Sequence, residues 1–221
     1  MKERIIAVVP IRSFRDGKTR LSLGLDAANR EGLVRSMAER VTGALAATDE
    51  IAETLVVSSD PEVLTWAGRL ARPVTPVEQT KTAPGLDAAI DLGRGIAAHH
   101  GADAMLSLFA DLPIVTGKDI AVLIESQGEL ILGTDRRRTG TNALLLRFSG
   151  RAREFRFAFG PESLERHLAE SRRIGLEVRV RDIPGIAFDL DTPEDLADVL
   201  ARGGDEPAAF DLPIECEVSS R

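Results

Sequence analysis

The stretch that decides the fold is Ala104–Pro113, AMLSLFADLP. Ser107 is the only polar residue before Asp111, which is typical of a strand buried on both faces in a parallel sheet. Pro113 disfavours helical geometry at the residue before it, so the strand is predicted to end in a loop that begins at Asp111. A carboxylate in that position lies at the ligand-binding edge of an α/β sheet. Asp111 is therefore a candidate site residue, with loop capping as the alternative role.

Composition limits the class of protein. The chain has 221 residues, of which 43% are hydrophobic, enough for one large α/β domain or two small ones. A net charge of −7 argues against a nucleic-acid-binding surface. The single cysteine, Cys216, excludes internal disulfides and suits a reducing compartment. The N-terminal apolar run is too short for a signal peptide, and no run is long enough to span a membrane. We expect a cytoplasmic protein with no membrane or nucleic-acid partner.

Buried strands alternate with helical segments along the chain. The pattern predicts strands over residues 5–9, 53–58, 74–77, 104–110, 129–132, 142–146, 176–180 and 186–190. It predicts helices over residues 26–47 and 62–71, from residue 86, from residue 116 or 117, over residues 164–174, and from residue 192. This alternation, with a mixed region after residue 130, predicts a three-layer α/β sandwich with a mixed sheet. We expect a single domain over residues 1–203, followed by an acidic tail over residues 204–221.

Two polar loops follow early strands. The first, IRSFRDGKTRL over residues 11–21, contains Arg12, Arg15, Lys18 and Arg20. A cationic loop at the end of a first buried strand is suited to bind phosphate, although it could also be a solvated basic loop. It is not a Walker A motif, because GxxxxGK[ST] is missing. The second loop, QTKTAPG over residues 79–85, precedes a helix N-terminus and is a second candidate ligand loop.

A pair of aspartates lies at the end of the last predicted strand. Asp189 and Asp191 are two residues apart, so in an extended segment they point the same way. Together with Asp111 they could hold Mg²⁺ through hard oxygen ligands, whereas helix capping before residues 192–195 is the alternative role. Basic residues and a divalent metal are what nucleotidyl transfer requires, because its catalysis is mainly positioning and charge neutralisation.

A series of short motifs runs in order between residues 5 and 200. They are Pro10-x-Arg12, Lys18–Leu21, Gly85–Leu86, Ala110–Pro113, Gly140–Leu144, Phe159-Gly160-Pro161-x-Ser163 with His167, and Asp189-x-Asp191 continued by Thr192–Leu196. Each motif is weak alone, but together they are specific. The sequence resembles the 2-phospho-L-lactate and phosphoenolpyruvate guanylyltransferase family of deazaflavin coenzyme F-420 biosynthesis.

The resemblance implies a fold, a reaction and a set of site residues. The fold is that of nucleotidyltransferases (GT-A, Rossmann-like), similar to molybdenum-cofactor guanylyltransferases and sugar nucleotidyltransferases. In the reaction, a phosphorylated three-carbon acid attacks the α-phosphorus of GTP and pyrophosphate leaves. The implied catalytic residues are Lys18, Arg20 and Asp111. The implied substrate-binding residues are Arg12, Gly85, Thr141, Asn142, Gly160 and Ser163, and the implied Mg²⁺ ligands are Asp111, Asp189 and Asp191.

The sequence departs from the family pattern at two positions. Arg12 stands where lysine is common, which keeps the charge but changes its geometry. Asp87 stands where asparagine is frequent, and a carboxylate cannot donate a hydrogen bond as an amide does. The choice among phosphoenolpyruvate, 2-phospho-L-lactate and 3-phospho-D-glycerate stays open, as does a homodimer. The alternatives are a nucleotidyltransferase for a sugar phosphate or molybdopterin acceptor, and a nucleotide-sensing module without activity.

Overall fold

The computed structural model describes residues 3–22, 24–71 and 73–202. These residues form a seven-stranded mixed sheet in the order β3-β2-β1-β4-β6-β5-β7. Strands β1 to β4 run parallel, β6 is antiparallel to β4 and β5, and β7 is parallel to β5. In sheet order the strands are Val74–Glu78, Ile51–Ser58, Ile5–Pro10, Ala104–Leu108, Thr141–Arg147, Leu130–Thr134 and Val178–Arg181. The predicted mixed sheet is confirmed.

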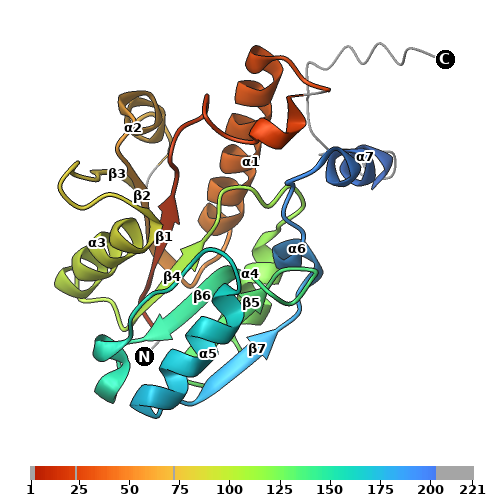
Figure 1. Cartoon of the computed structure of the whole chain (residues 1–221). Coiled ribbons are helices and arrows are strands. Elements are labelled where there is room, and N and C mark those ends of the chain that lie inside the picture. The colour runs from red at the N-terminus through yellow and green to blue at the C-terminus, as the bar shows by residue number, and fades with distance from the viewer. Residues whose placement is uncertain (1–2, 23, 72, 203–221) are drawn as a thin grey trace.

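Helices cover both faces of this sheet (Figure 1). One buried cluster joins the sheet to α1, α2, α4, α6 and α7, and a second joins the opposite face to α3 and α5. The molecule is therefore the three-layer sandwich that the sequence predicts. The helices are α1 Ala27–Ala46, α2 Pro61–Ala67, α3 Leu86–His99, α4 Gly117–Ile124, α5 Ser163–Ile174, α6 Pro184–Ala187 and α7 Pro193–Arg202, with short 3-10 helices η1 Thr19–Leu21 and η2 Gly150–Glu154.

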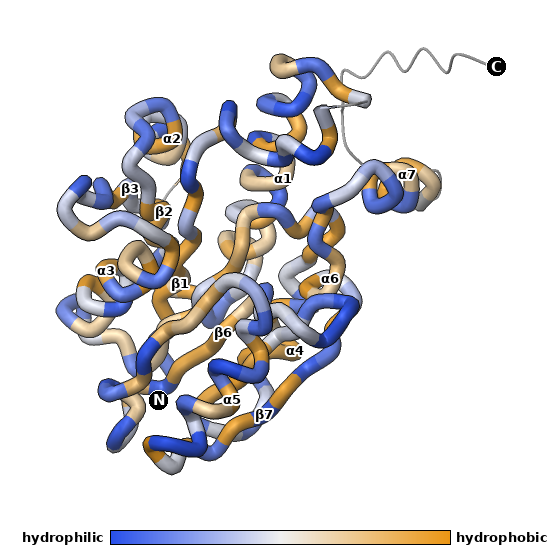
Figure 2. The backbone as a smooth tube through the Cα atoms, in the orientation of Figure 1, coloured by the Kyte–Doolittle hydropathy of each residue, from blue (hydrophilic) through white to orange (hydrophobic). Residues whose placement is uncertain are grey.

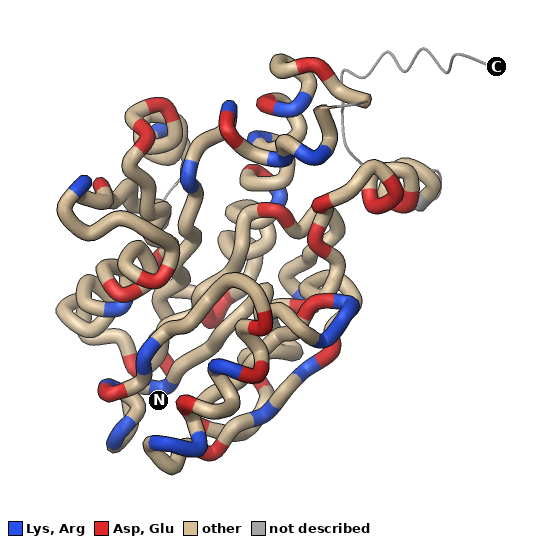
Figure 3. Tube along the Cα trace, in the orientation of Figure 1, with Lys and Arg blue, Asp and Glu red and all other residues tan. Residues whose placement is uncertain are grey.

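The interior strands are apolar because the helices bury them on both sides. All five residues of β4 are buried, as are the first five of β1. Figure 2 shows hydrophobic colours along the interior strands, and Figure 3 shows charged residues gathered on helices and loops. Packing is close where α3 crosses β1: a Cβ built on Gly93 would lie 2.5 Å from Val8 Cγ1.

Helix ends follow the expected capping chemistry. Asp26 accepts from Asn29 N–H, Asp60 accepts from Glu62 N–H, and Thr116 forms a capping box with Asp119. These caps fix where the loops that follow the strands end and the helices begin, and thereby the position of the site residues in those loops.

One predicted element is wrong. The predicted strand over residues 186–190 is replaced by α6 and an extended segment outside the sheet. Pro184 takes the first position of α6, where the missing N–H costs nothing. The predicted acidic tail over residues 204–221 lies outside the described residues. Within the described ranges, none of the helices has the length and apolar character needed to cross a membrane.

Candidate functional site

A large pocket opens at the edge where the parallel strands end. Its volume is about 890 Å³. The residues that follow β1, β2, β3 and β4 all contribute to its wall, as expected for a ligand site in an α/β sheet. The lining residues are Pro10–Ser13, Gly17–Arg20, Val34, Val57, Ser59, Gln79–Lys81, Pro84–Leu86, Ala89, Phe109–Asp111 and Asp191.

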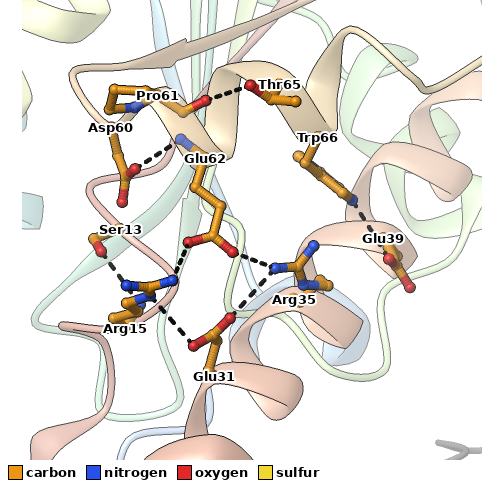
Figure 4. A network of polar contacts seen from close by, with 10 residues as sticks. All are labelled: Ser13, Arg15, Glu31, Arg35, Glu39, Asp60, Pro61, Glu62, Thr65 and Trp66. Atoms are coloured by element: carbon orange, nitrogen blue, oxygen red, sulfur yellow. Dashed lines mark hydrogen bonds and ion pairs between the residues drawn. The ribbon is translucent and has the colours of Figure 1, made fainter.

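The basic loop after β1 is anchored between α1 and α2 (Figure 4). Its buried Phe14 packs edge-to-face on Trp66, with ring centroids 5.2 Å apart, and the Arg35 guanidinium lies 4.7 Å from the Phe14 centroid. Arg35 Nη2 also donates to Glu62 at 2.7 Å, and Arg15 Nη2 lies 3.1 Å from the same carboxylate. Arg15 is thus committed to holding the loop in place.

The other cations of this loop face the pocket. Arg12 and Arg20 line it, and both are exposed. Lys81, from the second loop, lines it too. Within the described part of the chain, none of these three side chains forms an ion pair. They give the pocket a cationic rim that is free to meet an anion.

Lys18 occupies the centre of the site. Its Nζ donates to Asp111 Oδ2 at 2.6 Å and to Asp191 Oδ1 at 2.7 Å. Lys18 has a left-handed backbone, with φ of 53°, and this turn directs its side chain back toward the end of β4. Burial alone would lower the pKa of Lys18, but the charges of Asp111 and Asp191 outweigh it and raise that pKa. The lysine therefore stays protonated.

Three aspartates gather around this lysine. Leu190 N–H donates to Asp111 O at 3.2 Å, which joins the segment carrying Asp189 and Asp191 to the end of β4. Burial, followed by the charges of Asp111 and Asp191, raises the pKa of Asp189 to about 6. Asp111 Oδ1 is buried and lacks a hydrogen-bond partner among the described residues. The cluster thus contains more negative charge than Lys18 balances.

The second polar loop forms another wall of the pocket. Gln79 Nε2 donates to Ala83 O and Gly85 O, both at 2.8 Å, and so closes residues 79–85 into a compact turn. Gly85 has φ of +101°, a conformation that side chains other than glycine rarely adopt. The N-terminus of α3, with Leu86 exposed beside it, then faces the pocket.

A second group of polar side chains lies behind Phe109. Phe109 lines the pocket, packs on Phe159 with centroids 5.3 Å apart, and donates through its N–H to Asn142 O at 3.1 Å. Thr141 precedes Asn142 in the chain and Ser163 begins α5, and each is 2% exposed. Ser163 Oγ makes no hydrogen bond to any described residue. This hydroxyl is therefore available to a ligand or to water.

The structure thus divides the predicted site residues into two groups. Arg12, Lys18, Arg20, Gly85, Asp111 and Asp191 share the large pocket, and Asp189 adjoins it. Thr141, Asn142, Gly160 and Ser163 do not line that pocket among the described residues and belong to the group behind Phe109. Asn142 Nδ2 is already bonded to Ile186 O at 3.0 Å, so it holds α6 in place.

The sequence indicates Asp87 only as a departure from the family pattern and His167 only as part of a motif, and it does not single out Lys81. Lys81 sits in a loop that was predicted to bind a ligand, and its positive charge was the available signal. Asp87 accepts from Phe159 N–H at 2.8 Å, a contact that spans 72 positions and that the local sequence does not indicate. His167 contacts Thr141, and its spacing of four residues from Ser163 places both on one helix face.

Comparison with known proteins identifies the family. Residues 5–213 match the family model described as guanylyl transferase CofC like. The chain belongs to this family. It is 43% identical over 203 residues to a phosphoenolpyruvate guanylyltransferase of Rubrobacter xylanophilus, covering 90% of this chain and 95% of that protein. It is 31% identical over 199 residues to a 2-phospho-L-lactate guanylyltransferase of Methanothermobacter thermautotrophicus, covering 89% and 84%.

The fold of this CofC-like chain is shared with more distant nucleotidyltransferases. A solved nucleotidyl transferase of Methanothermobacter thermautotrophicus superposes with a TM-score of 0.62 at 19% identity, covering 90% of this chain and 97% of that one. At this identity the likeness shows the fold alone. It confirms the nucleotidyltransferase fold that the sequence motifs predict.

Proposed function

We propose that this protein transfers GMP from GTP to a small phosphorylated three-carbon acid and releases pyrophosphate, as a step in coenzyme F-420 biosynthesis. Family membership supports the reaction class, because the named relatives are guanylyltransferases for acids of this kind. The single observation that carries the proposal is the position of Lys18 between Asp111 and Asp191 at a cation-rimmed pocket. This arrangement fits a triphosphate.

The rim cations and Lys18 would bind the nucleotide phosphates. Arg12, Arg20 and Lys81 line the pocket without ion pairs among the described residues, so their charges are available to a polyanion. The N-terminus of α3 adds backbone N–H groups and the positive end of the helix dipole on the facing wall. The loop closed by Gln79 would lie beside the base and sugar.

The aspartates fit a divalent cation. Asp111 Oδ1 is buried without a partner among the described residues, and burial, followed by repulsion from Asp111 and Asp191, raises the pKa of Asp189. Carboxylate oxygens are the ligands that Mg²⁺ prefers, so Asp111, with Asp189 and Asp191, would hold it. As their side chains stand, no group of three His, Cys, Asp or Glu residues in the described ranges forms a ready-made metal site. When bound, Mg²⁺ would neutralise phosphate charge.

The acid would bind in the group behind Phe109. Thr141 and Ser163 offer hydroxyl groups, Gly160 has φ of +99°, and α5 begins at Ser163. A helix N-terminus attracts a carboxylate through its free N–H groups and its dipole. Phe109 lines the large pocket and also packs on Phe159, so the acid and the triphosphate would bind on either side of Phe109.

The chemistry needs no protein nucleophile. A phosphate oxygen of the acid forms a bond to the α-phosphorus of GTP, and the bond from that phosphorus to the bridging oxygen breaks. The electron pair leaves with pyrophosphate. Lys18 and Arg20 would offset the negative charge that develops on the leaving group, which is the main demand of this class of reaction. The single cysteine suits a reducing compartment, and we place the reaction in the cytoplasm.

One assay tests the proposal. Purified protein is incubated with Mg²⁺, each of the four nucleoside triphosphates, and phosphoenolpyruvate, 2-phospho-L-lactate or 3-phospho-D-glycerate in turn. We expect acid-dependent pyrophosphate release with GTP and with at least one of the acids. Release with no pair, or release only with another nucleotide, would contradict the proposed function.

A further inference from the structure

His167 connects two parts of the proposed acid site. It lies on α5, is 0% exposed, and faces both β6 and the extended segment before Gly160. Its Nδ1 lies 3.1 Å from Thr141 Oγ1, and its Nε2 lies 3.1 Å from the backbone nitrogen of Ala158. Both ring nitrogens are therefore engaged, one with a hydroxyl and one with the main chain.

The second contact fixes the proton on the ring. A backbone N–H can only donate, so Nε2 must accept from Ala158 and carries no proton. The pKa of His167 is lowered to about 4 by burial and then by the charge of Arg166, so the ring is neutral at neutral pH. Its one proton is on Nδ1, which consequently donates to Thr141 Oγ1.

The direction of that bond determines what Thr141 can do. Because Thr141 Oγ1 accepts from His167, its own hydrogen is free, and the described residues offer it no other partner. Ser163 Oγ is also unpaired in the described structure, and it lies on the same helix face as His167. Thr141 and Ser163 are each 2% exposed, so two hydroxyl donors are available on nearly buried residues.

We propose that His167 is a positioning residue that holds the Thr141 hydroxyl as a hydrogen-bond donor toward the acidic group of the substrate. The inference rests on the proposed function and deepens it. A hydrogen bond to a charged carboxylate or phosphate oxygen is stronger than one to a neutral oxygen, so a threonine hydroxyl fixed as a donor favours an anion over a neutral amide or alcohol. Specificity for an acid would then depend on His167, although His167 does not contact the substrate.

A purely structural role for His167 is the competing explanation. Its bond to Ala158 N–H helps to hold the segment 155–160, which is also held by Asp87 through Phe159 N–H and by Arg94 through Phe155 O. Arg156 N–H also donates to Glu170, and Phe159 O accepts from Arg166, so losing the Ala158 contact alone leaves the segment attached. The two bonds of His167 can therefore be separated by substitution.

Three variants separate the two bonds. In His167→Asn the amide nitrogen can take the place of Nδ1 and donate to Thr141, whereas in His167→Gln the amide oxygen can take the place of Nε2 and accept from Ala158. His167→Phe keeps a ring and loses both bonds. We expect Gln and Phe to raise the KM for the acid roughly tenfold to a hundredfold, Asn to stay near wild type, and the KM for GTP to change little in all three.

The same substitution made in the Thr141→Val variant tests whether His167 acts through Thr141. In Thr141→Val there is no hydroxyl to orient, so His167→Gln should add no further increase in the KM for the acid. Ser171→Ala is the matched control, because Ser171 is buried on the same helix and bonds only to Leu168 O within it. If His167→Gln raised the KM for the acid equally in the wild type and in Thr141→Val, the inference would be overturned.

The ring proton can also be measured without activity. The chain has three histidines, so nitrogen NMR of the labelled imidazoles, with His167→Gln for assignment, reports the tautomer. Protonation at Nδ1 supports the inference, and protonation at Nε2 overturns it whatever the kinetics. A wild-type protein with the Nδ1 tautomer but no acid-dependent pyrophosphate release would instead contradict the proposed function.

Discussion

Lys18 Nζ lies 2.6 Å from Asp111 Oδ2, across 93 positions of sequence. Lys18 comes from the loop after β1 and Asp111 from the end of β4, and these two strands are neighbours in the sheet. The strand order of the sheet therefore produces this bond, because it brings the basic loop against Asp111. The Lys18 side chain is 10% exposed, so water screens this charge pair only weakly, and the site is organised before a ligand binds.

Removing the charge of Lys18 or of Arg20 in the basic loop should weaken nucleotide binding. We expect Lys18→Ala and Arg20→Ala to raise the KM for GTP more than the KM for the acid, because both side chains line the large pocket and neither lies behind Phe109. Lys118→Ala is the control, since Lys118 is exposed on α4, away from the pocket. Steady-state kinetics with each substrate varied in turn decides the matter, and an unchanged KM for GTP in both variants would refute the assignment.

Metal removal should stop turnover. The carboxylates of Asp111, Asp189 and Asp191 repel one another, and a triphosphate adds further negative charge that Lys18 alone cannot offset. We expect EDTA to abolish pyrophosphate release and excess Mg²⁺ to restore it. Full turnover in the presence of EDTA would show that the lysine and arginine side chains offset the phosphate charge without a metal.

The metal site can also be tested by replacing the carboxylate of Asp111 with an amide. Asp111→Asn keeps the size of the side chain, and the residue is 31% exposed, so the fold should survive. We expect turnover to fall by roughly a hundredfold or more, the scale seen when an electrostatic contact in an active site is lost. Asp103→Asn is the control at the opposite end of β4, where the retained amide oxygen can still accept from Arg4 N–H. A near-normal rate for Asp111→Asn would exclude it from the site.

The sequence predicts the part of the site that depends on local pattern. A buried strand that ends in Asp111 and a basic loop after β1 are visible because each is continuous in the chain. The caps of α1, α2 and α4 are predictable for the same reason, since one side chain bonds to an N–H two or three residues on.

Contacts between distant segments are not predictable in this way. Arg15 looks like the other cations of its loop, but Glu31 and Glu62 hold it away from the pocket. Asp87 departs from the family pattern, and the structure uses its carboxylate as an acceptor for Phe159 N–H. The run over residues 186–190 is apolar enough for a strand, yet it lies outside the sheet because α6 begins at Pro184. Each outcome depends on partners that are far away in the sequence.

His167 should make stability depend on pH. Its pKa is about 4 in the folded protein and about 6.5 when unfolded, so between these values the unfolded chain binds more protons. Stability should fall as pH decreases from about 6.5 to about 4, by up to about 3 kcal/mol from this group. Asp189, whose pKa is raised to about 6, acts in the opposite direction. The difference between wild type and His167→Asn in denaturant unfolding isolates the histidine, and parallel pH curves would refute this assignment.

Ser163 offers the clearest separation between binding and stability. Its hydroxyl forms no cap for α5, because Glu162 precedes the helix in a left-handed conformation without a side-chain cap bond. Ser163→Ala should therefore leave the melting temperature nearly unchanged. It should raise the KM for the acid by the equivalent of roughly 1–3 kcal/mol, because a hydrogen bond to an anion is lost, while the KM for GTP stays the same. Ser171→Ala removes a buried hydroxyl that bonds within α5 and should leave both KM values unchanged. A lower melting temperature with normal kinetics in Ser163→Ala would mean that Ser163 serves the helix and not the substrate.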